Sequence, residues 1–135
     1  MSVEMVLKYK NAVSRNYFKL QHDWKNKADG TFGSFDGKVI AGFKFKHRFN
    51  LQRGENFPLA SLFRTVDREL AAGRKVIVSL PSGDRLWHMY VIDRPIGKDE
   101  YMAYSRAFNQ DRVLVKNNVK RAIRACKGTD ILTYQ

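Results

Sequence analysis

The stretch from Asn56 to Ile92 constrains the fold more than any other part of the chain, because it joins one amphipathic helix to two apolar strands. Asn56 can cap this helix, Pro58 lies in its first turn, and Gly73 supplies the stop. Its apolar stripe has helical spacing and consists of Leu59, Leu62, Phe63, Val66 and Leu70. A helix with one apolar stripe needs a sheet or a second helix to cover it.

Three strands and a basic helix follow. The first strand has a nearly continuous apolar run, RKVIVSLP, which is typical of a strand in the middle of a sheet. The turn SGD then leads into RLWHMYVID, so these two strands are predicted to form a hairpin. We expect a further strand at EYMAYSRAF, a basic helix over residues 112–127 and a last strand at TDILTYQ.

The amino-terminal part has weaker signals. Residues 2–20 carry an apolar stripe at spacings of three and four, so they are expected to form a helix that Ser2 can cap. Residues 21–37 are polar and rich in glycine and are read as a loop, whose glycine spacing matches no phosphate-binding fingerprint. The order of elements predicts one α+β domain over residues 1–135, with helices packed on a mostly antiparallel sheet.

The chain is strongly basic, with a formal net charge of +12 and a pI near 10.0. Lysine and arginine exceed aspartate and glutamate in both halves of the sequence, so the charge belongs to the folded body. Such a charge favours a polyanionic partner, which could be a nucleic acid, an anionic membrane surface or an acidic protein. We expect no membrane insertion, because no apolar run approaches about 18 residues.

The cysteine content points to a reducing compartment. Cys126 is the single cysteine of the sequence, which excludes an internal disulfide and a cluster of thiolate metal ligands. The expected location is therefore cytoplasmic, including the cytosol of a target cell into which a larger secreted protein delivers this domain. The histidines His22, His47 and His88 match no metal-ligand spacing, so neither a metal nor another cofactor is expected.

A basic strand is expected from Lys38 to Asn50, before the central helix, and it contains the stretch GFKFKHRFN. If side chains alternate, one face carries Phe43, Phe45, His47 and Phe49, and the other face carries Lys44, Lys46 and Arg48. The cationic face is either a solvated or protected sheet edge, or a row that binds phosphates. His88 has a similar ambiguity, because it lies on an apolar strand, in a face that Leu86, Tyr90 and Ile92 share. It is either a hydrogen-bonded core residue or a general acid or base.

The run LFRTVDRELAAGRKVIVSLPSGDRLWHMYVI resembles the second half of papain-like domains of the bacteriocin-processing peptidase type. The resemblance covers about residues 60–135 and implies a papain-like fold, with His88 as the catalytic histidine. It also implies that Ser105 or Asn109 on the next strand orients His88. Papain-like peptidases need a cysteine near the amino terminus, and no cysteine precedes Cys126, so a thiol peptidase is not expected.

A papain-like scaffold with a histidine, a strong positive charge and no thiol nucleophile also resembles the basic toxin domains of interbacterial, contact-dependent inhibition. This resemblance implies a metal-independent ribonuclease acting on RNA, for example tRNA, which supplies its own 2′-hydroxyl nucleophile. His88 and His47 would transfer protons, and Lys44, Lys46 or Arg48 would bind the phosphate. Because His47 alternates with these cations, they could share a site only if the strand ends, twists or bulges.

The resemblance to toxins further implies an acidic immunity protein and, for some members, a translation elongation factor as a helper. On the predicted helix 112–127, the cations can contact phosphates or form a docking surface, and they are Lys116, Lys120, Arg121 and Arg124. Aromatic side chains can stack on unpaired bases or fill the core, and the candidates are Phe43, Phe45, Trp87, Tyr101 and Tyr104. Two alternatives remain open: a non-enzymatic RNA-binding module, and a degenerate papain-like domain that binds a protein or transfers an acyl group.

Overall fold

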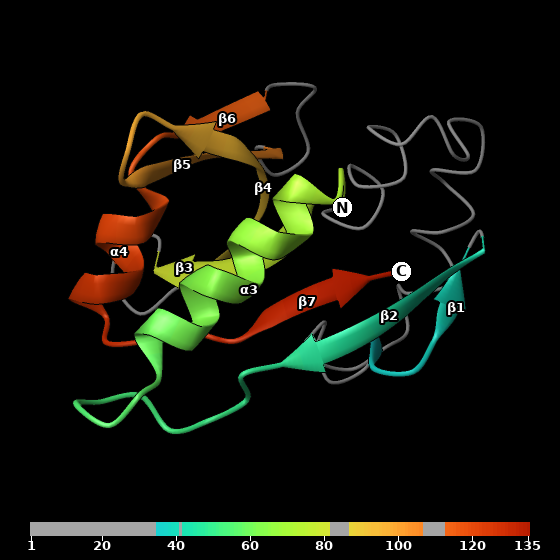
Figure 1. The fold of residues 1–135 in the computed structure, drawn as a ribbon, viewed down its shortest axis with the longest axis horizontal. Helices are drawn as coiled ribbons and strands as arrows, with labels where there is room; N and C mark the ends of the chain where they lie inside the picture. The colour runs from blue at the N-terminus through green and yellow to red at the C-terminus, as the bar shows by residue number, and fades with distance from the viewer. Residues whose placement is uncertain (1–34, 41, 82–86, 107–112) are drawn as a thin grey trace.

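The computed structural model describes residues 35–40, 42–81, 87–106 and 113–135. Two helices, α3 and α4, lie on one side of an antiparallel sheet (Figure 1). The helices are α3 Leu59–Ala71 and α4 Val119–Ala125. The strands are β1 Val39–Ile40, β2 Phe43–Arg48, β3 Val76–Pro81, β4 Trp87–Ile96, β5 Glu100–Arg106, β6 Val113–Lys116 and β7 Ile131–Tyr134.

The sheet has the strand order β1-β2-β7-β3-β4-β5-β6. Each neighbouring pair in the described chain is antiparallel. The last strand in sequence, β7, therefore lies between β2 and β3. This arrangement confirms the prediction of an α+β fold with helices packed on a mostly antiparallel sheet. No helix of the described ranges is both long enough and apolar enough to cross a membrane.

The central strand β3 is buried on both faces, as its continuous apolar run predicts. On one face its Val76, Val78 and Leu80 pack against α3 and α4 in a first core cluster. On the other face Ile77 belongs to a second cluster, whose buried members also include Phe35, Phe45, Val91, Leu132 and Tyr134. We refer to these two sides of the sheet as the helix face and the opposite face.

Helix α3 buries the stripe that its sequence predicts. Leu62, Phe63 and Val66 are buried, and Leu59 and Leu70 pack partly buried against the same cluster. The stripe covers the helix face of β3 and β4 and forms much of the first core cluster.

The predicted strand 38–50 is interrupted. Gly42 adopts a φ of 83°, and the chain forms a short hairpin between β1 and β2 at this point. The strand then ends at Arg48, because Phe49 has a φ of 60° and turns the chain. Phe49 consequently packs beside Phe57 against the helix-face cluster, so the prediction that it shares a side with Phe43 and Phe45 was wrong.

The predicted helix over residues 112–127 was wrong in its first half. Val113 to Lys116 form β6, which pairs with β5 along its whole length, and α4 begins only at Val119. The alternation of β-branched and other residues in VLVK suits a strand, and Asn117 and Asn118 separate it from the helix. Lys116 therefore lies on a strand of the sheet and not on a helix.

Gly128, between α4 and β7, provides a test of the packing. Its φ is 121°, and a Cβ atom there would lie 2.4–2.6 Å from ring carbons of Phe57. We expect Gly128→Ala to lower the free energy of unfolding by about 3 kcal/mol, because it adds backbone strain to a steric clash. Urea denaturation measures this loss.

Gly97→Ala is the matched control, because Gly97 also has a positive φ, 57°, but has open space around it. The control should cost about 1 kcal/mol from backbone strain alone. Equal losses in the two variants would contradict the described contact between Gly128 and Phe57.

Candidate active site

His88 and Ser105 are hydrogen-bonded to each other on the helix face of β4 and β5. The distance from His88 Nε2 to Ser105 Oγ is 2.7 Å. Ser105 Oγ also donates to the Met89 carbonyl oxygen at 2.7 Å. A hydroxyl has one proton, and a carbonyl oxygen can only accept, so Ser105 must accept from His88. The neutral His88 ring is therefore assigned a proton on Nε2 and a lone pair on Nδ1.

This pattern decides what each of the two side chains can do. Among the described residues no group bonds His88 Nδ1, so this nitrogen is available to accept a proton from a ligand. Ser105 is buried, at 4% relative exposure, and its proton points to the backbone and not to the histidine. A serine nucleophile needs the reverse polarity, with its proton given to the base. Ser105 is thus placed to orient His88 and not to attack a substrate.

Tyr90 and Lys116 complete this cluster. The His88 and Tyr90 rings meet edge to face with centroids 5.3 Å apart, and Lys116 Nζ lies 5.6 Å from the centroid of the same Tyr90 ring. The Tyr90 hydroxyl bonds no described group, and the described residues contain no buried side-chain polar atom without a partner, so this hydroxyl reaches solvent. We call His88, Tyr90, Ser105 and Lys116 the His88 cluster.

Sequence reasoning did not select Tyr90 as a functional residue. The signal was present, because Tyr90 lies two positions after His88 and strand alternation puts both on one face. Lys116 was selected as a helical cation, and its place beside Tyr90 follows from the β5–β6 register, which pairs it with Ala103.

His47 lies on the other side of the sheet. Its strand partner is Leu132 of the opposite-face cluster, whereas the partner of His88 is Leu80 of the helix-face cluster. The structure therefore does not bring His47 and His88 into one site. His47 Nε2 lies 2.6 Å from Asp130 Oδ2, and the His47 backbone N–H donates to Asp36.

The β2 cations also stay apart from His47. The β2–β7 register is continuous, with no bulge, so Lys44, Lys46 and Arg48 face the helix side while His47 faces away. The combined site of His47 with these cations, which would need a local distortion, is thus not formed. Asp130 as a partner of His47 was missed, because a contact across 83 sequence positions has no local signal.

The three β2 cations line a hollow of about 460 Å³ between the β2–β7 pair and α3. Arg48 lies 3.9 Å from Glu69 of α3, and Arg74 bonds the same carboxylate. Lys44 and Lys46 are exposed and form no side-chain ion pair within the described ranges. We call this concavity the lysine hollow, and Thr133 of β7 also lines it.

Two cations of α4 that were predicted to bind RNA, Lys120 and Arg124, form ion pairs within the protein. Lys120 Nζ and Arg124 Nη1 bond the Asp99 carboxylate at 3.2 and 3.1 Å, and both cations lie over the Phe63 ring. The hydrogen bond from Arg124, followed by that from Lys120, holds the pKa of the Asp99 carboxyl below its usual range. These contacts tie α4 to the β4–β5 turn and leave the two cations less available for phosphate.

Glu100 caps α4, in place of a residue at the start of the helix itself. Its carboxylate accepts the backbone N–H groups of Lys120 and Arg121, while Asn118 makes no side-chain capping bond. The Arg121 side chain is exposed. The sequence did not predict this cap, because Glu100 belongs to β5 and not to the residues that directly precede α4.

Of the two roles open to the candidate aromatic residues, base stacking or core packing, at least two residues have the core role. Phe45 and Tyr101 are 0% and 1% exposed, so they cannot stack on bases. Burial, followed by the hydrogen bond to Asp67, raises the pKa of Tyr101 above its usual range. Phe43 and Tyr104 are partly buried against the opposite-face cluster.

Asn109, one of the two residues predicted to orient His88, lies outside the described residues. His22, the predicted helix 2–20 and the side chain of Trp87 lie outside them as well. In the part of the chain that is described, no three histidine, cysteine, aspartate or glutamate side chains group as metal ligands would.

Comparisons of the chain with protein-family models, with curated proteins and with solved structures found no match.

The hydrogen-bond pattern of His88 can be tested directly by the ¹⁵N chemical shifts of its ring nitrogens. We expect neutral His88 to carry its proton on Nε2 in the wild type, because Ser105 provides the acceptor. Ser105→Ala should give a mixture of the two tautomers and lower the free energy of unfolding by about 1 kcal/mol. His47, which Ser105 does not contact, is the internal reference. A wild-type proton on Nδ1 would contradict this assignment.

Proposed function

We propose that this protein is a ribonuclease domain that cleaves RNA at the His88 cluster by general acid–base catalysis. The observation that carries the proposal is the hydrogen bond between His88 Nε2 and buried Ser105, which leaves His88 Nδ1 without a partner among the described residues. A cation, Lys116, and a solvent-reaching phenol, Tyr90, lie in the same cluster. The net charge of +12 supports a polyanionic substrate.

The proposed reaction needs no nucleophile from the protein. His88 Nδ1 accepts the proton of a ribose 2′-hydroxyl, and the 2′-oxygen attacks the neighbouring phosphorus. The bond from phosphorus to the 5′-oxygen breaks, and that oxygen takes a proton from the Tyr90 hydroxyl. Lys116 neutralises the charge that develops on the phosphoryl oxygens. The products are a 2′,3′-cyclic phosphate and a 5′-hydroxyl, and solvent returns the protons to their starting positions.

We further propose that the domain acts as a toxin on RNA such as tRNA in the cytosol of a competing cell. The support is the papain-like resemblance of the stretch around His88, and the resemblance of such a scaffold, with its basic charge and without a thiol nucleophile, to interbacterial toxin domains. An acidic immunity protein that covers the cationic surface follows from the same proposal, as does a translation elongation factor as a helper. No metal or other cofactor takes part in the proposed mechanism.

A non-enzymatic RNA-binding module is the second candidate function. The lysine hollow favours it, because Lys44 and Lys46 are exposed cations without carboxylate partners in the described chain. In this alternative His88 is a core residue held by Ser105, and the positive charge alone gives salt-sensitive affinity. A degenerate papain-like domain that binds a protein would show neither RNA cleavage nor RNA binding.

Incubation of the purified protein with total RNA in EDTA tests the proposal. We expect cleavage, and we expect His88→Ala to reduce its rate at least about 100-fold, since this variant lacks the general base. Far-UV circular dichroism and RNA affinity should stay unchanged in the variant.

His47→Ala removes the other described imidazole and is the matched control, because its side chain lies on the opposite face. Cleavage that survives His88→Ala but is lost in His47→Ala would overturn the assignment. RNA binding without any cleavage by the wild type, with cell extract added, would favour the binding module instead.

Tyr90→Phe tests the proton donor separately. It keeps the ring that His88 and Lys116 contact and removes only the hydroxyl, so we expect kcat to fall by about 100-fold with KM little changed. The defect should shrink on a substrate whose 5′-leaving group is a good one, such as a nitrophenol, because that leaving group needs no proton. An equal defect on both substrates would exclude Tyr90 as the acid.

A further inference from the structure

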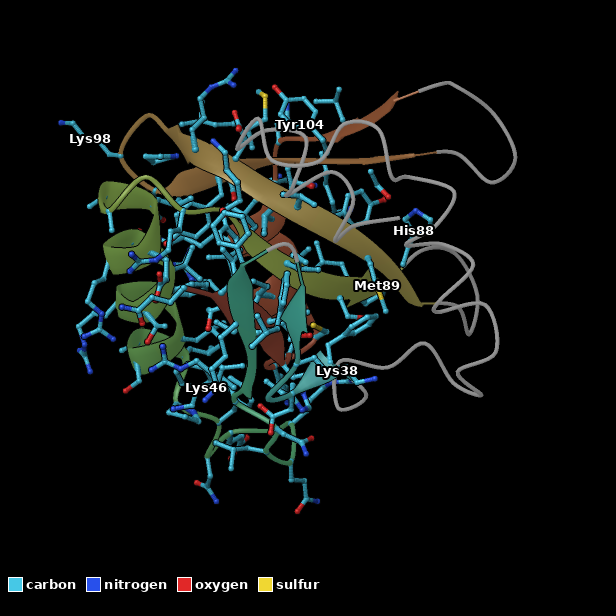
Figure 2. All side chains as sticks on the ribbon, turned by 90° about the vertical axis from the view of Figure 1, so that its right-hand side faces the viewer. Lys38, Lys46, His88, Met89, Lys98 and Tyr104 are labelled. Atoms are coloured by element: carbon cyan, nitrogen blue, oxygen red, sulfur yellow. The ribbon has the colours of Figure 1, made fainter. Side chains whose placement is uncertain are left out.

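The lysine hollow lies at the other end of the sheet from the His88 cluster. Strands β2 and β4 are separated by β7 and β3, which places Lys46 and His88 about 14 Å apart across the strands. The registers displace the two residues by a further distance of about 13 Å along the strands. In Figure 2, Lys46 lies at the lower left and His88 at the upper right of the view. The two sites are therefore roughly 20 Å apart.

The hollow has the properties of a site for successive phosphates. Lys44, Lys46 and Arg48 project from one strand face at intervals of two residues, about 7 Å, which is close to the separation of neighbouring phosphates along a nucleic acid strand. The hollow is concave, with a volume of about 460 Å³, and the Thr133 hydroxyl also lines it. A solvated protective edge row needs no such concavity.

The carboxylates that line the hollow are already used by protein donors. Asp36 accepts the backbone N–H of His47, and Glu69 is bound by Arg74 and lies close to Arg48. Lys44 and Lys46 have no such partner within the described ranges, in contrast to the α4 cations that Asp99 binds. The neutral amide that Asp36 accepts does not cancel its charge, but three cations, Lys44, Lys46 and Arg48, line the hollow against two carboxylates. The net charge of the lining side chains is thus positive.

We propose that the lysine hollow is a remote phosphate-binding subsite, so that the substrate class is RNA long enough to span both sites and not a dinucleotide. This inference takes the His88 cluster as the cleavage site from the proposed function. Phosphate binding at the hollow does not depend on that proposal. A strand that occupies the hollow and the His88 cluster together must contain several nucleotides. Very short RNA reaches the His88 cluster without the help of the hollow.

Binding by non-cleaving protein separates this inference from the catalytic proposal. The probes are a fluorescent dinucleotide and a fluorescent RNA of about 15 nucleotides, which covers a typical single-strand site. In a His88→Ala background, we expect Lys44→Gln with Lys46→Gln to weaken binding of the long RNA about tenfold and to reduce the salt slope by about 2. Affinity for the dinucleotide should not change.

Lys98→Glu is the matched control. It changes the net charge by the same amount as the two glutamine substitutions, and Lys98 lies in the β4–β5 turn, away from Lys46 (Figure 2). We expect it to leave the affinity for the long RNA within about twofold of the wild type. An equal loss in the control, or an equal loss for both probes, would show a diffuse charge effect and would overturn the inference.

Cleavage assays give the second readout. With His88 intact, the two glutamine substitutions should raise KM for the long RNA and leave kcat unchanged. If the wild type cleaves nothing but the length-dependent binding loss is seen, the catalytic proposal fails and the hollow remains a phosphate site. If cleavage is normal and the binding loss is absent, only the hollow is excluded.

Discussion

Burial of β3 on both faces is the constraint on which the rest of the structure depends. A strand with apolar side chains on both sides needs a cover on each side of the sheet. Helices α3 and α4 cover one side, and the second cluster around Phe45 and Leu132 lies on the other. Because cross-strand partners share a face, this division also decides that His88 and His47 point in opposite directions. The chemistry available to each histidine thus follows from the packing of β3.

The few carboxylates of this basic protein determine which cations remain available. Asp99, Asp93 and Glu69 each contact two cations, which are Lys120 with Arg124, Lys75 with Arg94, and Arg74 with Arg48. Burial alone would raise the pKa of Asp93, but the hydrogen bonds from its two cations outweigh burial and lower it. These pairs fasten turns and helix ends. Lys44 and Lys46 on β2 and Lys116 beside Tyr90 are not among these paired cations.

Sequence patterns predicted the elements of the fold that neighbouring residues determine, but they predicted fewer of the contacts in the candidate site. The stripe of α3 and the β3–β4 hairpin followed from spacing and turn residues, because neighbours in sequence create them. The contact of Ser105 with His88 joins adjacent strands, and the role of the pair stays a prediction. The contacts of Asp130 with His47 and of Glu100 with α4 could not be found, since they depend on registers between distant segments. Phe49 was misplaced because a positive φ in a non-glycine residue has little sequence signal.

The position of β7 has a consequence for the order in which the molecule assembles. The α3–β3–β4–β5 region closes short loops, whereas β2 enters the sheet only through pairing with a strand more than 80 positions later. Contacts of such long range cost the most chain entropy, so we expect this pairing to form late. His88 of β4 and Ser105 of β5 would then be hydrogen-bonded before β2, which carries Lys44 and Lys46, has paired with β7. A chain stalled at that stage would possess the proton acceptor but not the surface that grips a long polyanion.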